Sequence, residues 1–317
     1  MKAIVIEHAG GPEALELKEV PTPKVKPGWT LVKVKGFGIN RSEIFTRNGE
    51  SPTVTFPRIL GIECVGVIAD TSDPDHLPVG QKVVSIMGGM GRAFDGGYAE
   101  YALLPNAQIY PVATNLSWPE LAAVPETYYT AYGSLHNMHI QDADSVLIRA
   151  ATSGVGVAAT QLAKAIKPGI KVAGSTRSKA KFDLLKKVGC DEPVLDTNSE
   201  LQTDDHFDAV LELVGTKTIK DSFKHLNPGG YLCLTGGLGN EWVIKDFDPF
   251  VLPMGASLTN FGSGFNVTKE KIADLLHLIE SHHIDVQPSQ IFDLAHTGDA
   301  QAALDRSDSF GKVVVLP

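Results

Sequence analysis

The sequence predicts a two-domain α/β protein in which a β-rich part precedes a doubly wound sheet of parallel strands. Up to about residue 115, short alternating or β-branched runs are interrupted by Gly and Pro, as in antiparallel β-structure. From Ser117 onward, short apolar runs alternate with helical patterns, which is typical of a parallel sheet with helical crossovers. A chain of 317 residues is long enough for two domains that each bury a core.

Each candidate element is supported by its local pattern. The β-rich part has five short runs of strand character, 3–6, 30–34, 65–69, 82–86 and 98–103. Ser117 is suited to cap a helix, with Pro119 just inside it and Glu120 in the first turn. Six apolar runs then predict a six-stranded parallel sheet: 145–149, 171–175, 193–195, 209–213, 231–234 and 257–261. We also expect helices over 155–166, near 182–188 and near 272–279, and a last strand over 312–316.

Composition and charge exclude several classes of protein. The net charge of −9 disfavours binding to nucleic acid or to an anionic membrane. No apolar run approaches the roughly 20 residues that span a bilayer, and Glu7 interrupts the apolar N-terminus too early for a signal peptide, so we expect a cytoplasmic protein. The three cysteines, Cys64, Cys190 and Cys233, are too far apart for a Cys-x-x-Cys metal site. We interpret them as small buried hydrophobic residues, with a reactive thiol as the alternative.

Seven short segments occur in a characteristic order along the chain: GFGINRSE (36–43), GIEC (61–64), GGYAEY (96–101), AVPETYYTAYG (123–133), TSGVG (152–156), TRSKAK (176–181) and GKVVV (311–315). Through these segments the chain resembles the medium-chain dehydrogenase/reductase superfamily from residue 1 to 317, and most closely its zinc-free quinone oxidoreductase branch. In the zinc enzymes of the superfamily, Cys, His and Cys stand where this chain has Asn40, Ile62 and Glu126. Asn and Ile do not supply the nitrogen and sulfur ligands of such a site, so we predict no bound metal.

The resemblance implies a domain division and an oligomeric state. A GroES-like β-barrel catalytic domain is expected over 1–116 and 262–317, because the last strand returns to the first domain in this family. A Rossmann dinucleotide-binding domain is expected over 117–261. The family also implies a homodimer, formed through the sheet edge around 255–261, where an apolar strand would otherwise lack a neighbour.

A strand, the turn from Arg149 to Gly156 and a following helix form the context of a dinucleotide-binding fingerprint. Such a turn presents backbone N–H groups and a helix N-terminus to pyrophosphate. Ala151 and Ser153 replace the first two glycines of the usual pattern, and Gly156 keeps the third. We predict that Ser153, Gly154, Val155 and Gly156 bind the cofactor, with a purely structural turn as the alternative.

The residues after the second parallel strand favour NADPH over NADH. An NAD site normally has an acid about 20 residues after the turn, but no acid occurs between Ala151 and Phe182, where six Lys and Arg residues lie. We predict that Ser175, Arg177 and Lys181 bind the 2′-phosphate. The alternative is that Arg177 and Lys181 are solvated surface residues. The resemblance also assigns Thr130, Val214, Thr235, Gly236 and Gly237 to cofactor binding.

Asn40 and Tyr128 are the candidate catalytic residues. Asn40 stands at the cleft position of the family and can both donate and accept hydrogen bonds; its alternative is to cap the turn between a strand and a helix. Many zinc-free relatives have a Tyr five residues beyond this Asn, where this chain has Phe45. Tyr128 or Tyr129 could supply the missing hydroxyl, although core packing is an equal alternative for both.

The predicted function is NADPH-dependent, zinc-free transfer of hydride to a small electrophilic acceptor, either a quinone or an α,β-unsaturated carbonyl compound. Such acceptors need little help from a Lewis acid. Two alternatives stay open. One is an enoyl-thioester reductase, and the other is an NADPH-binding redox sensor with little turnover.

Overall fold

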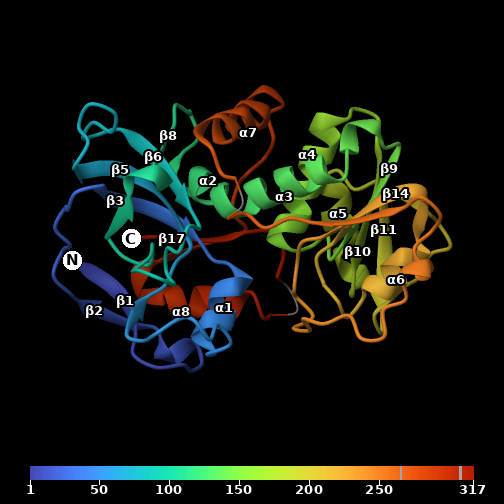
Figure 1. Ribbon diagram of the computed structural model, residues 1–317, viewed down its shortest axis with the longest axis horizontal. Helices are drawn as coiled ribbons and strands as arrows, with labels where there is room; N and C mark the ends of the chain where they lie inside the picture. Colours follow the sequence, from blue (N-terminus) through green and yellow to red (C-terminus); the bar gives the residue numbers. More distant parts are fainter. Residues whose placement is uncertain (265, 307–308) are drawn as a thin grey trace. The chain divides into compact units, whose positions relative to one another are not determined.

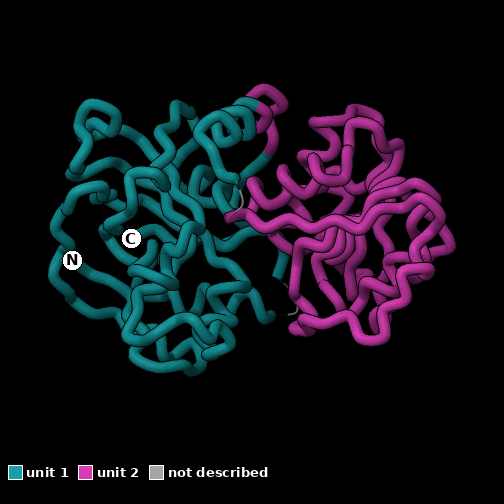
Figure 2. Tube along the Cα trace, viewed as in Figure 1, with its two compact units in different colours: residues 1–126, 266–277, 285–317 teal, residues 127–265, 278–284 magenta. Residues whose placement is uncertain are grey.

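The computed structural model describes residues 1–264, 266–306 and 309–317, and these residues form two compact units (Figures 1 and 2). Unit 1 contains Met1–Glu126, Asn266–His277 and Asp285–Pro317, and unit 2 contains Thr127–Phe265 and Leu278–Ile284. No helix in the described part of the chain is long and apolar enough to cross a bilayer.

Unit 1 is built mainly of β-strands, as the sequence predicts for its first part. Its larger sheet has the order β16-β17-β3-β5-β6-β8, with β7 paired to β3, and a smaller sheet has the order β2-β1-β4. All of its strand pairs are antiparallel except β16 with β17. The strands are β1 Lys2–Ile6, β2 Glu16–Glu19, β3 Trp29–Gly38, β4 Arg58–Ile59, β5 Glu63–Thr71, β6 Lys82–Ile86, β7 Tyr101–Pro105, β8 Tyr110–Pro111, β16 Gln290–Asp293 and β17 Val313–Leu316.

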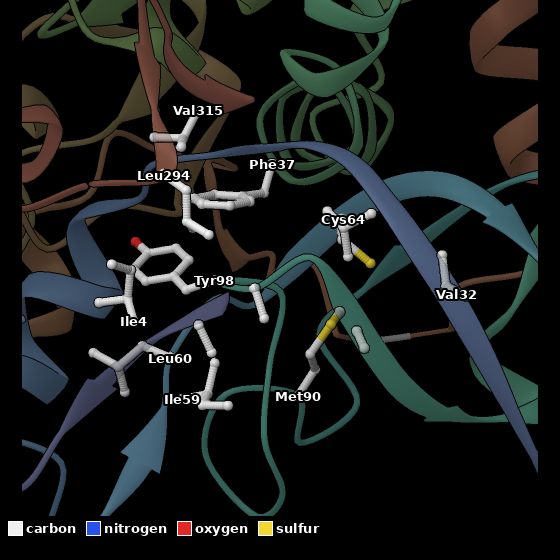
Figure 3. Close-up of a cluster of buried hydrophobic side chains, with 14 of the residues drawn as sticks. Ile4, Val32, Phe37, Ile59, Leu60, Cys64, Met90, Tyr98, Leu294 and Val315 are labelled. Carbon is white, nitrogen blue, oxygen red and sulfur yellow. The ribbon is translucent and has the colours of Figure 1, made fainter. Parts of the chain in front are cut away.

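The core of unit 1 lies between its two sheets and is drawn in Figure 3. The rings of Phe37 and Tyr98 stack there with their centroids 4.7 Å apart. Ile4, Leu60 and Met90 belong to the same cluster and are almost completely buried. Tyr98 therefore has a ring in the hydrophobic core and a hydroxyl at its boundary. The buried hydroxyl requires a hydrogen-bond partner.

Among the described residues, four helices and three 3₁₀ turns accompany these strands: α1 Arg41–Arg47, α2 Trp118–Ala122, α7 Lys269–Ser281, α8 Thr297–Ala303, η1 Pro12–Ala14, η2 Asn106–Gln108 and η6 Leu294–His296. The end of α7, from residue 278 onward, belongs to unit 2. The helix expected from Ser117 is interrupted at 123–124, since Pro125 begins a new helix. Helix α2 packs on β3, β5 and β17. It therefore belongs to unit 1, whereas the predicted division placed it in the Rossmann domain.

Unit 2 contains the doubly wound sheet, in the order β12-β11-β10-β9-β13-β14-β15. The six predicted strands are all present and parallel, and short β12 adds an antiparallel edge that the sequence did not indicate. The strands are β9 Ser145–Arg149, β10 Lys171–Thr176, β11 Glu192–Thr197, β12 Glu200–Leu201, β13 Phe207–Glu212, β14 Leu226–Leu234 and β15 Ser257–Asn260. The helical elements are α3 Pro125–Asn137, α4 Gly154–Ile166, α5 Phe182–Lys187, α6 Ile219–Lys224, η3 Ile140–Asp142, η4 Lys179–Lys181 and η5 Pro249–Val251.

A fully buried arginine joins several elements of this sheet. Arg149 ends β9, and its side chain has no exposed surface. Its guanidinium lies 2.9 Å from a carboxylate oxygen of Asp196 and 3.0 Å from one of Asp221. It also donates to the Ser222 hydroxyl and to the backbone carbonyl groups of Thr218 and Ser199. One side chain thus connects the ends of β9 and β11 to the start of α6.

Replacement of Arg149 is expected to destabilise unit 2 strongly. Arg149→Met leaves two largely buried carboxylates without their cation, and we expect a loss of about 3–5 kcal/mol in the free energy of unfolding measured with urea. Lys171→Met is the matched control. Lys171 pairs with Glu192 at 2.7 Å but is half exposed, so its loss should cost less than about 1 kcal/mol. Similar losses in the two variants would contradict this account of Arg149.

Candidate functional site

The predicted site residues fall in both units, and each unit contains a distinct polar cluster. In unit 1, β3 ends at Gly38 and Asn40 is the N-cap residue of α1. Glu43, three residues later, accepts a hydrogen bond from the Asn40 backbone N–H at 2.8 Å, as in a capping box. Asn40 therefore caps α1, as the alternative interpretation states, and it does so through its backbone. Its side chain forms other hydrogen bonds.

The Asn40 side chain lies between a buried lysine and a buried glutamate. Its Oδ1 accepts from the Lys312 ammonium at 2.7 Å, and its Nδ2 donates to Oε1 of Glu63 at 2.9 Å. Lys312 also donates to Glu63 at 2.8 Å. The side chain of Glu63 is fully buried and that of Lys312 is 7% exposed. We call Asn40, Glu63 and Lys312 the Lys312 triad.

Gly38 lies in close contact with the Lys312 triad. A Cβ atom at this position would lie 2.2 Å from Cε of Lys312 and 2.4 Å from Oε1 of Glu63, which is closer than real atoms approach. A side chain at residue 38 would therefore displace Lys312 or Glu63 from their present positions.

A second buried carboxylate, that of Glu43, bonds the backbone of Asn40. Glu43 accepts from the Tyr98 hydroxyl at 2.5 Å and from the Ile62 backbone N–H at 2.8 Å. Removal from water raises the pKa of Glu43 to about 7, despite these hydrogen bonds. Burial and the nearby carboxylate also raise the pKa of Tyr98. Gln301 donates to the Tyr98 hydroxyl at 3.2 Å and accepts a hydrogen bond from the Arg47 guanidinium at 2.8 Å.

Glu43 and Glu63 bond the backbone of the three residues that stand at zinc-ligand positions, namely Asn40, Ile62 and Glu126. Glu43 accepts from the backbone N–H of Asn40 and Ile62, and Glu63 accepts from the Glu126 backbone N–H at 2.7 Å. No group of three His, Cys, Asp or Glu side chains in the described residues is arranged to hold a metal ion. An amide that is already bonded, an aliphatic side chain and one carboxylate do not make a zinc site.

In unit 2, the predicted phosphate-binding turn lies between β9 and α4. The Ser153 hydroxyl caps α4, because it accepts from the Gly156 backbone N–H at 3.1 Å. A Cβ atom at Gly156 would lie 2.6 Å from the Ala150 carbonyl oxygen, so this glycine allows close packing of the helix against the turn. Gly154 and Val155 are half-buried. This cradle fits a pyrophosphate group at the N-terminus of a helix.

Ser175 stabilises this turn by a hydrogen bond to its backbone. Its side chain is fully buried, and its hydroxyl accepts from the Ala150 backbone N–H at 3.0 Å. Ala150 has a φ of 62°, an uncommon value for a residue with a side chain. We therefore correct the prediction for Ser175, which holds a strained turn and has no surface for direct contact with a cofactor. The unusual backbone of Ala150 had no signal in the sequence.

Arg177 follows β10 at the same edge of the sheet and is exposed. It forms no ion pair with any acid among the described residues. Other basic residues of its segment do form ion pairs, among them Lys164 with Asp191, Lys167 with Asp144 and Lys171 with Glu192. The positive charge of this segment is therefore partly neutralised. The half-buried Lys181 ends the 3₁₀ turn η4.

The cofactor-binding candidates Val214, Thr235, Gly236 and Gly237 follow the ends of β13 and β14. The buried carboxylate of Glu212 accepts from the Val214 and Gly215 backbone N–H groups at 2.7 and 3.0 Å, and burial raises its pKa. A Cβ atom at Gly236 would lie 2.0 Å from the Leu213 carbonyl oxygen. The segments that follow β13 and β14 are thus in direct contact at Leu213 and Gly236. Gly237 is the next residue after this contact.

Helix α3 contributes Thr130 and Tyr128. Ser134, one turn after Thr130, connects α3 to the end of β14, because its hydroxyl lies 2.8 Å from that of Thr235 and donates to the Thr130 carbonyl at 2.7 Å. Tyr128 is buried, and its hydroxyl donates to Gln161 of α4 at 2.8 Å. The packing alternative therefore describes Tyr128 better than the role of proton donor.

Comparison with known proteins agrees with this arrangement. Residues 26–114 match the family model for the alcohol dehydrogenase GroES-like domain, and residues 188–315 match the model for zinc-binding dehydrogenases. Quinone oxidoreductase of Rattus norvegicus is 30% identical over 251 residues, which are 76% of this chain and 74% of the relative. Acryloyl-coenzyme A reductase of Metallosphaera sedula is 26% identical over 260 residues, or 75% of this chain and 77% of the relative.

A solved structure resembles the whole chain. The mycobacterial protein Rv1454c, whose structure is complexed with NADPH, has a TM-score of 0.86 and 25% sequence identity, and the match covers all of both chains.

The raised pKa of Glu43 predicts a specific dependence of stability on pH. An unfolded Glu ionises near pH 4.5, whereas folded Glu43 retains its proton until about pH 7. Between these values the folded state binds more protons, so the contribution of Glu43 is full below pH 4.5 and is lost as the pH rises through 7. We expect the free energy of unfolding of Glu43→Gln, relative to the wild type, to increase by roughly 3 kcal/mol over this window.

Urea unfolding at half-unit steps from pH 4.5 to 8 measures this difference. The comparison uses the slopes of the two curves, because the amide also changes the hydrogen bonds at this position. Parallel curves would show that Glu43 does not titrate in the expected range.

Proposed function

Because the chain belongs to the medium-chain dehydrogenase/reductase superfamily, in its quinone oxidoreductase branch, we propose that it transfers hydride from NADPH to quinones or to α,β-unsaturated carbonyl compounds without a metal ion. The observation that carries this proposal is the Lys312 triad. It holds the amide of Asn40, which stands at one of the three zinc-ligand positions, against a buried ion pair. Without a Lewis acid, the acceptor itself must be electron-poor.

Each unit contributes part of this chemistry. In unit 2, the turn 153–156 would hold the pyrophosphate, Arg177 and Lys181 the 2′-phosphate, and Thr130, Val214, Thr235, Gly236 and Gly237 the nicotinamide half. When bound, NADPH supplies the hydride. In unit 1, Asn40 is the candidate for contact with the nicotinamide or with the substrate oxygen. The proton that completes the reduction would come from ordered water or solvent, since Tyr128 is committed to Gln161.

Oxidation of NADPH against two panels of acceptors tests the proposed reaction. We expect turnover with quinones or with alkenals, read as loss of absorbance by NADPH, and no effect of a chelator. Activity that is lost on chelation and restored by zinc would refute the metal-free reaction. Tight binding of NADPH with no turnover on either panel would favour a redox sensor.

The acyl-thioester alternative is the second candidate, because one relative is an acryloyl-coenzyme A reductase. The same assay with crotonyl-coenzyme A and crotonaldehyde separates the two candidates. Preference for the thioester by a large factor in kcat/KM would move the assignment to an enoyl-thioester reductase.

Arg177 is expected to determine the choice of nucleotide. One charge-assisted hydrogen bond of about 1.5 kcal/mol corresponds to a factor of about ten, so Arg177→Ser should lower kcat/KM for NADPH about tenfold and leave that for NADH unchanged. Lys179→Ser is the matched control, because Lys179 is an exposed cation two residues away and is not assigned to the phosphate. An equal loss with both nucleotides would remove Arg177 from the phosphate site.

We also propose a homodimer formed through β15. This strand has one partner, β14, among the described residues. Apolar side chains near it are exposed, including Phe250 at 94% and Met254 at 89%, and an open strand edge with apolar neighbours favours pairing with a second copy. Sedimentation should give a dimer for the wild type and a monomer for a Phe250→Asp and Met254→Asp double variant. A monomeric wild type at micromolar concentration would refute this.

A further inference from the structure

The structure restricts the hydrogen bonds that Asn40 can offer to a ligand. An ammonium group only donates and a carboxylate only accepts, so Lys312 must meet the amide oxygen and Glu63 the amide nitrogen. The distances, 2.7 Å to Oδ1 and 2.9 Å to Nδ2, agree with this assignment. The second Nδ2 proton faces the Gly38 carbonyl oxygen at 3.4 Å. Both donor protons of the amide therefore have acceptors within the protein.

The side chain of Asn40 is nevertheless half-buried and not fully buried, so a ligand can reach it. With both protons engaged, the oxygen is the polar atom that retains capacity for another hydrogen bond, since a carbonyl oxygen has two lone pairs. We propose that Lys312 and Glu63 are positioning residues that hold Asn40 as a hydrogen-bond acceptor, so that it binds an N–H or O–H group of the ligand and does not donate to a carbonyl oxygen.

This inference rests on the proposed function for the identity of the ligand, and two sources could supply the donor. One is the carboxamide NH₂ group of the nicotinamide, and the other is the hydroxyl group of the reduced acceptor. Two arms of one binding experiment distinguish them. The first compares thionicotinamide-NADP⁺, which retains the NH₂ group, with 3-acetylpyridine-NADP⁺, which lacks it. The second compares hydroquinone with its dimethyl ether in the presence of NADP⁺.

We expect the wild type to bind the ligand that retains the donor about fivefold more tightly in at least one arm, which corresponds to one hydrogen bond. Either Lys312 or Glu63 alone imposes the same orientation on the amide, so Glu63→Gln should retain most of this preference. The double variant Glu63→Gln and Lys312→Met removes one negative and one positive charge, so the net charge does not change. It also removes the two charged groups that orient the Asn40 amide. It should bind both members of the pair equally, because either end of the amide can then meet the ligand.

The matched control is the double variant Glu7→Gln and Lys18→Met, which removes an exposed ion pair of the same length, 2.8 Å, and should keep the fivefold preference. Thermal melting shows whether each variant is folded. A purely structural role of the triad would weaken both ligands together and leave their ratio unchanged. The proposal is overturned if the folded Glu63→Gln and Lys312→Met variant keeps the preference, or if the wild type has none in either arm.

Exchange of the Asn40 side-chain amide protons, followed by NMR in the ligand-free protein, separates this proposal from the proposed function. We expect slow exchange in the wild type and fast exchange in the triad double variant. Fast exchange in the wild type would overturn the positioning role. If NADP⁺ analogues failed to bind while exchange remained slow, the proposed function would fail and the triad would stand.

Discussion

The buried ion pair between Glu63 and Lys312 is the interaction on which the arrangement of unit 1 depends. A buried charge is costly unless it is paired and hydrogen-bonded, and these two charges satisfy each other at 2.8 Å. Glu63 also bonds the Asn40 side chain and the Glu126 backbone. The pair therefore joins the end of β3, the start of β5, the start of α3 and the last strand, and Gly38 leaves the space that it needs.

Unit 2 uses the same principle at the edge of its parallel sheet. Arg149 and Glu212 end neighbouring strands, and both are fully buried beneath the predicted cofactor site. Arg149 neutralises Asp196 and Asp221, while Glu212 holds the backbone of Val214 and Gly215. The residues that would contact the cofactor are thus supported by charged groups that have no contact with solvent. This rigid support is what a site for transfer between bound reactants requires.

Local patterns predicted most of the fold. The six parallel strands were found because buried strands are continuous apolar runs. Ser153 was predicted to bind the cofactor from its place between a strand and a helix, and the structure shows that it also caps α4. The two-residue strand β12 and the α2 boundary were missed, because they depend on pairing and packing with distant segments. The residue types and positions of Tyr128 and Ser175 were compatible with contact to substrate or cofactor. Only their hydrogen-bond partners show that they stabilise the protein around the predicted site.

The lack of a complete set of zinc ligands at Asn40, Ile62 and Glu126, and of an acid after the second parallel strand, can be read from the residues alone, because side-chain chemistry decides which ligands are possible. The orientation of the Asn40 amide cannot. Its partner Lys312 lies 272 residues away in the chain, and no local pattern records a contact at that separation. Only the folded chain brings a cation, a carboxylate and an amide together, and their neighbourhood decides which atom of Asn40 is left for a ligand.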